Sequence, residues 1–285
     1  MANDYADFEL LLLEGGSRDD TVAVLEGLAA RDPRIRVVAG LPSDLCSKRN
    51  AGMNEARGSL LVYCDDDTVP SQGWIGAYVR AAESWDSLMV GATFPRGDGP
   101  AVAIRPWTTS RVWKPTFWNK VVYWPIGVGA NFACSQNIAR EVGGWDSRFP
   151  IGEDSDFFLR VLRSGRAIRT VPEAVVEHDT LSDWHTLVRK RHGYARGATY
   201  LLRRKYARTL HGWCSIAVFL GTWSVVLAAD LLTLRRRRIR LSWHRLCGGL
   251  AGLFGSSDWA EHEAAMAARF AAAAPAGPGR QDPTL

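Results

Sequence analysis

Three consecutive carboxylates, Asp65, Asp66 and Asp67, are the residues of this sequence whose spacing most directly suggests chemistry. They follow the apolar run 59–64, which has the pattern of a buried parallel strand. Ligands of open parallel sheets bind beyond the carboxyl ends of the strands, so the cluster lies where a ligand is expected. Adjacent carboxylates repel one another unless a cation or hydrogen-bond donors offset the repulsion. The cluster therefore predicts a divalent cation that also holds a diphosphate; an acidic helix N-cap is the alternative.

Short apolar runs alternate with amphipathic stretches around this cluster and must position it. Strands are predicted at 8–13, 36–39, 59–64 and 88–94, and helices at 19–30, 47–57 and 71–84. This order predicts an α/β fold with a mostly parallel sheet that helices cover on both faces. A Pro- and Trp-rich excursion over 98–123 precedes a further helix at 153–164 and a strand at 167–171.

The composition excludes a disordered chain and a disulfide-stapled scaffold. Of the 285 residues, 47% are hydrophobic and 23% are charged, which is enough to bury a core. The five cysteines are scattered without a CxxC spacing, which argues against a disulfide framework and against a structural zinc site. No signal peptide is visible at the start of the sequence, so a cytoplasmic location is expected.

Six short segments occur in a characteristic order and spacing. They are FELLLLEGGSRDDT at 8–21, KRNAG at 48–52, CDDDTVP at 64–70, GGWD at 143–146, GEDSDF at 152–157 and VEH at 176–178. In this order they resemble family 2 glycosyltransferases with the GT-A fold, over roughly residues 8 to 180. The resemblance implies a Rossmann-like domain over 1–180 that transfers a sugar from a nucleoside-diphosphate sugar, with UDP, GDP or dTDP as the nucleotide. Glycans, lipid-linked sugars and small molecules all remain open as acceptors.

The resemblance also implies roles for the acidic cluster. Asp65 and Asp66 would bind the nucleotide sugar, with Asp65 on the ribose side, and Asp67 would bind the metal. His178 would be a second metal ligand for Mn²⁺ or Mg²⁺, and a neutral imidazole suits Mn²⁺ better. The metal would neutralise the leaving nucleoside diphosphate. A structural histidine is the alternative for His178.

The pair Glu153 and Asp154 resembles the acidic motif that carries the catalytic base of the family. An acceptor hydroxyl must lose its proton as it attacks the anomeric carbon, and a nearby carboxylate can accept that proton. Asp154 is the expected base, and Glu153 is the second choice or the residue that orients the acceptor. A single in-line attack inverts the anomeric configuration. The alternative is that both residues only make up an acidic first turn of the helix 153–164.

Four further residues complete the predicted site. Lys48 and Arg49 open a helix after a loop, which suits a diphosphate, although a solvated basic turn is the alternative. Trp145 is expected either to stack on an acceptor ring or to lie in the core, and Asp146 is assigned with it to the acceptor side.

The sequence departs from the family at two places. The family usually has Asp-Asp-Gly-Ser where this chain has Glu14, Gly15, Gly16 and Ser17. Glu14 and Ser17 are still expected to contact the nucleotide, whereas Gly15 lacks a carboxylate. The usual first strand and helix are also missing before Phe8, so an upstream start or another segment is expected to supply them. These departures are the reason for keeping a catalytically degenerate module, which binds a glycan or a partner enzyme, as the alternative to an active transferase.

The remainder, 181–263, is expected to be helical and basic, and 264–285 to be a disordered tail. Residues 212–229 carry no charge, Asp230 interrupts them, and Arg235 to Arg238 follow. This pattern predicts a helix in contact with the anionic inner face of the plasma membrane, with a membrane span or a buried core helix as alternatives. No nucleic-acid partner is expected.

Overall fold

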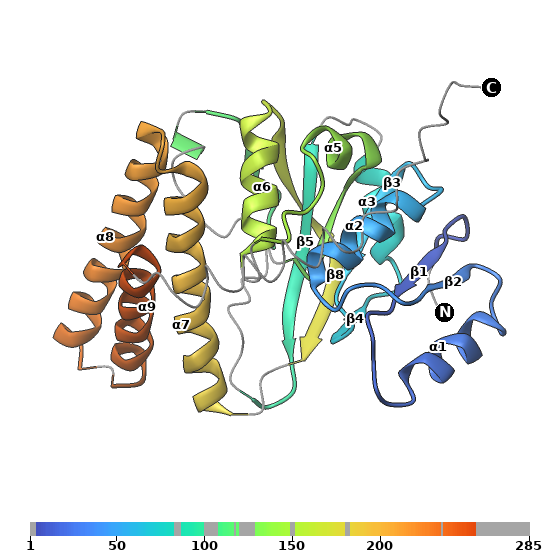
Figure 1. Cartoon of the computed structure of the whole chain (residues 1–285), viewed down its shortest axis with the longest axis horizontal. Coiled ribbons are helices and arrows are strands. Elements are labelled where there is room, and N and C mark those ends of the chain that lie inside the picture. Colours follow the sequence, from blue (N-terminus) through green and yellow to red (C-terminus); the bar gives the residue numbers. More distant parts are fainter. Residues whose placement is uncertain are drawn as a thin grey trace, which may run out of the picture.

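The computed structural model describes residues 4–82, 87–99, 108–116, 118–119, 129–148, 152–179, 183–234 and 236–254. It confirms the predicted fold class, because a central sheet is flanked by helices and followed by three long C-terminal helices (Figure 1). The predicted excursion 98–123 lies partly outside the described residues, and the predicted tail 264–285 lies wholly outside them.

The predicted helices and strands are present in the predicted order, most with bounds that differ by a few residues, but the strand predicted at 167–171 extends to Asp179 and short strands at Thr68–Pro70 and Val112–Trp113 were not predicted. In chain order they are β1 Leu10–Leu13, α1 Thr21–Ala29, β2 Ile35–Val38, α2 Leu45–Glu55, β3 Leu60–Cys64, β4 Thr68–Pro70, α3 Trp74–Ala82, β5 Ser87–Arg96, β6 Val112–Trp113, β7 Asn131–Ser135, α5 Gln136–Glu141, α6 Glu153–Arg163, β8 Ala167–Asp179, α7 Trp184–Leu201, the π-helical turn η1 Leu202–Tyr206, α8 Leu210–Leu232 and α9 Arg236–Phe254.

The sheet is mixed, so the prediction of a mostly parallel sheet was wrong in this respect. The strand order is β3-β7-β5-β8-β4, β6 also pairs with β8, and β1 and β2 form a separate parallel pair. Among the described strands only β1–β2 and β5–β8 are parallel pairs, whereas β7 runs antiparallel to both of its neighbours. An apolar pattern reveals that a segment is a strand but not its direction, because direction depends on where the preceding connection returns the chain.

A buried amide holds the centre of the sheet together. The side chain of Asn131 is 1% exposed and accepts hydrogen bonds from Trp74 Nε1 and Tyr78 Oη, both at 2.8 Å. Its Nδ2 donates to the carbonyl oxygens of Ala92 and Ala174, both at 2.9 Å, where the register of β5 against β8 shifts. Every polar atom of this amide is therefore satisfied, and α3, β5, β7 and β8 are locked around it.

A buried ion-pair network joins the C-terminal helices to α6. The carboxylate of Asp156 is fully buried, accepts a hydrogen bond from Tyr206 Oη at 2.7 Å, and pairs with Lys205 at 2.9 Å and with Arg160 at 2.8 Å. Lys205 also reaches Asp146 at 2.8 Å. The turn η1 is thus tied to the first turn of α6, which carries the predicted acidic motif.

The helices α7 and α9 pack closely because glycine lines their contact. A methyl group at Gly248 would collide with the carbonyl oxygen of His192, and one at Gly252 would collide with that of Arg196. Thr199 Oγ1 donates a hydrogen bond to the carbonyl oxygen of Gly249 at 2.7 Å in the same contact. Small residues allow such a close approach of two helix backbones.

The long apolar helix α8 packs on α9 and leaves much of its surface exposed. Asp230, which interrupts the uncharged stretch, is only 4% exposed, accepts a hydrogen bond from Ser242 Oγ at 2.7 Å and pairs with Arg238 at 3.1 Å. Residues Gly212–Leu232 are long and apolar enough to cross a membrane, and only 17% of their apolar window is buried. This low burial argues against the alternative of a core helix.

Candidate functional site

The pairing of β4 with β8 brings two distant parts of the chain to the end of β3. Thr68 pairs with His178, and the amide of Asp179 donates to the carbonyl oxygen of Asp67 at 3.0 Å. As a result, the ligand atoms of Asp65, Asp67 and His178 all lie within 4.8 Å of one another. Asp66 is exposed and is not part of this group.

The donor set of this group fits a divalent cation. His178 Nδ1 lies 2.9 Å from the carbonyl oxygen of Asp179, and because a carbonyl only accepts, Nδ1 carries the hydrogen. The lone pair of the neutral ring is then on Nε2, which lies 3.5 Å from Asp67 Oδ1. Burial, together with Asp65 and Asp66, raises the pKa of Asp67, and His178 opposes this effect. A bound cation would relieve the repulsion among these carboxylates.

Arg49 lies at the centre of the site, but it does not lie where a diphosphate ligand was predicted. It is 4% exposed and pairs with Asp65 at 3.0 Å and with Glu153 at 3.2 Å. Its guanidinium also donates to the carbonyl oxygen of Gly129 at 3.1 Å and stacks 4.5 Å above the ring of Trp145. This arginine therefore positions two carboxylates from the inside, because three of its hydrogen bonds are made to groups of the protein.

The segment Glu14 to Ser17 is folded back on itself. Glu14 is 6% exposed, and its Oε1 accepts from the amide of Ser17 at 2.5 Å. Hydrogen bonds from Ser17 hold the pKa of Glu14 below its ordinary value. The predicted contact of Glu14 with a nucleobase would require this turn to open.

Lys48, by contrast, is half-buried and has no ion-pair partner among the described residues.

Neighbouring atoms fill the space beside Gly15, which gives a structural reason why this chain has glycine where the family usually has aspartate. A side chain there would meet the carbonyl oxygen of Pro42 at 2.9 Å, Cδ of Lys48 at 3.0 Å and Cα of Ser43 at 3.2 Å. Gly15→Asp should therefore lower the free energy of unfolding by roughly 1–3 kcal/mol, as overpacking does. Urea unfolding measures this effect. The control is Gly27→Asp, where nothing lies within 4 Å; an equal loss in both variants would contradict the explanation.

Asp154 and Glu153 take different places at the start of α6. Asp154 Oδ2 accepts from the amide of Gly129 at 3.0 Å, and Oδ1 accepts from the amide of Ser155 at 2.6 Å, so its orientation is fixed. Glu153 points to Arg49 instead, with only 14% of its side chain exposed. Burial and the neighbouring charge of Asp154 raise the pKa of Glu153 to about 7, and Arg49 opposes the rise. The two carboxylates thus differ: hydrogen bonds fix the orientation of Asp154, whereas Glu153 is paired with Arg49 inside the protein.

The helix α7 carries two residues with shifted pKa values that were not predicted from the sequence. Burial raises the pKa of Tyr194, and the charges of Asp154, Glu153 and Asp65 raise it further. Arg191 precedes it by one helical turn; burial lowers its pKa to about 10, and its Nε has no hydrogen-bond partner among the described residues. The available signal was the spacing of three, which puts an aromatic and a cationic side chain on one face of a helix.

Trp145 and Asp146 are not arranged as acceptor ligands. Trp145 is 3% exposed and stacks on Phe157 with ring centroids 4.5 Å apart, so the core alternative holds. Asp146 pairs with Lys205 and Arg148, both of which hold its pKa well below the ordinary value although burial opposes them. A Trp-Asp pair close to an acidic motif suggested an acceptor site, but packing and ion pairing account for both side chains.

Comparison with known proteins points to one family. A family model described as glycosyl transferase family 2 matches residues 1–142. This range includes the acidic cluster and Arg49, whereas Glu153, Asp154 and His178 follow it. The functional assignment of those three residues therefore depends on their positions in the structure.

Several curated proteins resemble the chain over longer ranges. The probable glycosyltransferase YdaM of Bacillus subtilis is 22% identical over 218 residues, which are 70% of this chain and 50% of that protein. The succinoglycan biosynthesis protein ExoM of Rhizobium meliloti is 23% identical over 275 residues, 90% of this chain and 85% of that protein. The pre-mycofactocin glycosyltransferase of Mycobacterium tuberculosis is 27% identical over 150 residues, 48% of this chain and 31% of that protein. The chain thus spans only half the length of YdaM and less than a third of the mycobacterial protein.

Proposed function

Because the chain belongs to glycosyl transferase family 2, we propose that it transfers a sugar from a nucleoside-diphosphate sugar to an acceptor hydroxyl. The family match and the relatives named as glycosyltransferases support a transferase enzyme. The single observation that carries the proposal is the group Asp65, Asp67 and His178, assembled at the end of β3 next to Glu153 and Asp154.

Asp65, Asp67 and His178 would hold Mn²⁺ or Mg²⁺, and the mixed oxygen and nitrogen donor set favours Mn²⁺. The ion, when bound, supplies charge that neutralises the departing nucleoside diphosphate. Lys48, which has no ion-pair partner among the described residues, would contact the phosphates, since Arg49 is occupied by Asp65 and Glu153. Asp66 is exposed beside Asp65, as a residue that binds the nucleotide would be. UDP, GDP and dTDP remain open as the nucleotide.

Asp154 would accept the proton of the acceptor hydroxyl as that hydroxyl attacks the anomeric carbon. It accepts three hydrogen bonds, one from the amide of Gly129 and two from the amide and the hydroxyl of Ser155, and a lone pair is left for an acceptor because a carboxylate offers about four acceptor positions. Glu153, paired with Arg49, would orient the site. A direct displacement of this kind inverts the anomeric configuration.

The enzyme would work in the cytoplasm, at the inner face of the plasma membrane. The exposed apolar helix α8 and the arginines that follow it support this location. A lipid-linked sugar is the acceptor that suits such a location best, with a soluble glycan or a small molecule as the other acceptor classes.

The test is a screen of nucleotide sugars with purified protein and Mn²⁺, read by mass spectrometry of the released nucleotide. We expect release from one nucleotide class, a loss of at least about a hundredfold on chelation of the metal, and recovery on adding Mn²⁺ back. A protein that binds UDP, GDP or dTDP with metal by calorimetry but releases nothing from any donor would favour the alternative of a degenerate binding module. Turnover that is unchanged by chelation would contradict the metal site.

A further inference from the structure

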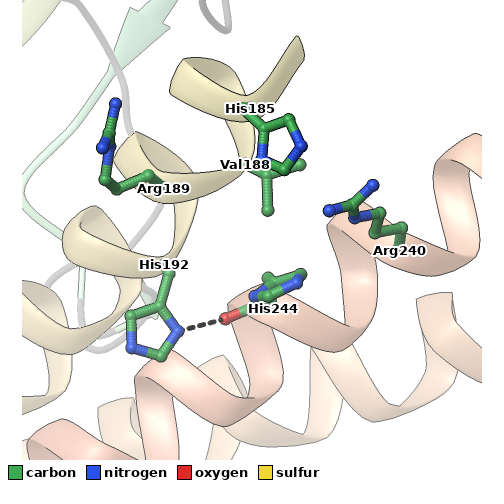
Figure 2. Close-up of a pocket in the computed structure, with 6 residues that line it drawn as sticks. All are labelled: His185, Val188, Arg189, His192, Arg240 and His244. Atoms are coloured by element: carbon green, nitrogen blue, oxygen red, sulfur yellow. Dashed lines mark hydrogen bonds between the residues drawn. The ribbon is translucent and has the colours of Figure 1, made fainter.

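A cavity of about 380 Å³ lies between α7 and α9 and shares no lining residue with the carboxylate site. Figure 2 shows that residues of α7 face residues of α9 across it, with a hydrogen bond from His192 Nδ1 to the carbonyl oxygen of His244 at 3.1 Å. Its lining residues are His185, Val188, Arg189, His192, Arg240 and His244. Nothing in the proposed transfer reaction uses them.

The cavity has the charge of an anion site. Five of its six lining side chains are histidine or arginine, the sixth is Val188, and none is a carboxylate. Burial lowers the pKa of His244, and the nearby His192 and Arg240 lower it further. The lowered pKa favours the neutral ring of His244, so the positive charge of the lining comes from Arg189 and Arg240, and an anion could pair with these two guanidinium groups.

The geometry favours an anion over a metal ion. Two arginines line the cavity, and an arginine is always charged and cannot be a metal ligand. Among the described residues, three ligand atoms converge within 4.8 Å at Asp65, Asp67 and His178 and not at these histidines. Arginine presents a planar fork that matches the oxygens of a phosphate, so phosphate is the anion that this lining fits best.

The surroundings of the cavity indicate how the phosphate would be presented. The turn between α8 and α9 exposes Leu231, Leu232 and Leu234 by 51%, 87% and 82%, and Trp243 beside His244 is 54% exposed. Figure 1 shows this turn and the beginning of α7 at the lower edge of the molecule, the edge toward which β5 and β8 also point. Leucines and a tryptophan next to a basic cavity are typical of a surface at a membrane interface.

We propose that this cavity binds the phosphate of an anionic membrane lipid while the leucines of the α8–α9 turn insert among the acyl chains. The inference rests on the membrane contact within the proposed function, but not on glycosyl transfer. The bound lipid would hold the strand ends that carry the carboxylate site toward the membrane surface.

Co-sedimentation of the full chain with vesicles tests the proposal, using phosphatidylcholine vesicles with and without phosphatidylglycerol. The variant is Arg189→Gln/Arg240→Gln, which removes two exposed cations of the cavity. The matched control is Lys190→Gln/Arg236→Gln, which removes two exposed cations of the same helices outside it. We expect the cavity variant to bind anionic vesicles at least about tenfold more weakly than the control, because directed charge-assisted hydrogen bonds add to the general attraction.

Equal losses in the two double variants would overturn the proposal, because they would show a general surface attraction. Inorganic phosphate and pyrophosphate form the second arm, followed through the NMR signals of the histidine rings. Shifts that saturate with free phosphate as readily as with a short-chain phosphatidylglycerol would overturn the lipid assignment. Vesicle binding is measured without donor or Mn²⁺, so its result does not depend on whether the protein transfers a sugar. Failure of membrane contact would show as no binding of the unmodified chain to any vesicle.

Discussion

Asp154→Asn is expected to reduce sugar transfer by about 10²–10⁴-fold, which is the usual contribution of a general base. The substitution keeps the shape of the side chain and an oxygen that can accept from the amide of Gly129. It removes the negative charge and the ability to take a proton from the acceptor hydroxyl. The measurement is the initial rate of transfer at saturating Mn²⁺ and donor, with folding checked by thermal unfolding.

Two further measurements separate a base from a structural acid. Nucleotide affinity, measured by calorimetry with metal, should change less than threefold in Asp154→Asn, since the base acts on the acceptor. Glu153→Gln is the matched comparison, because that carboxylate pairs internally with Arg49. If Asp154→Asn transferred sugar at the unmodified rate while Glu153→Gln did not, the two roles would have to be exchanged.

Asp156→Ala is expected to destabilise the protein by about 3–5 kcal/mol, as breaking a buried ion pair does. The carboxylate is fully buried and is shared by Arg160, Lys205 and Tyr206. Removing it leaves the guanidinium, the ammonium and the hydroxyl without their common acceptor. Urea unfolding followed by circular dichroism measures the change in the free energy of unfolding.

Two control variants give free energies of unfolding with which the loss in Asp156→Ala can be compared. Tyr206→Phe removes one hydrogen bond to the same carboxylate and should cost about 1.5 kcal/mol. Glu141→Ala breaks an exposed ion pair with Arg166 at 2.6 Å and should cost about 0–1 kcal/mol. A loss in Asp156→Ala no larger than that in Glu141→Ala would mean that the network does not hold the C-terminal helices to α6.

Much of the fold and of the carboxylate site could be predicted from the sequence because it depends on local pattern. The run before Asp65 is apolar, so a strand that ends at a carboxylate cluster was recognisable, although β3 is mostly half-buried and antiparallel to β7 rather than buried and parallel. The acidic first turn of α6 and the long basic helix α7 were recognisable in the same way, from residues a few positions apart. Such local order needs no knowledge of the partners across the molecule.

Only the tertiary structure decided which side chains contact one another across the sheet and between helices. Arg49 was read as a phosphate ligand, yet it is buried between Asp65 and Glu153, which lie 16 and 104 positions away along the chain. Trp145 was expected either on the acceptor side or in the core, and Asp146 on the acceptor side, yet Trp145 stacks on Phe157 and Asp146 pairs with Lys205. A charged or aromatic side chain has the same pattern in a sequence whether it meets a ligand or another side chain, because long-range packing determines which one it meets.

The acidic cluster shows both sides of this division. The sequence by itself determined that Asp65, Asp66 and Asp67 follow a strand, where a ligand site was expected. Only the tertiary structure decided that Asp65 and Asp67 converge with His178 while Asp66 stays apart. The physical reason is the antiparallel pairing of β4 with β8, a contact between segments more than a hundred residues apart in the chain. The anion cavity between α7 and α9 arises likewise from glycine-mediated packing of two helices, which neither helix specifies alone.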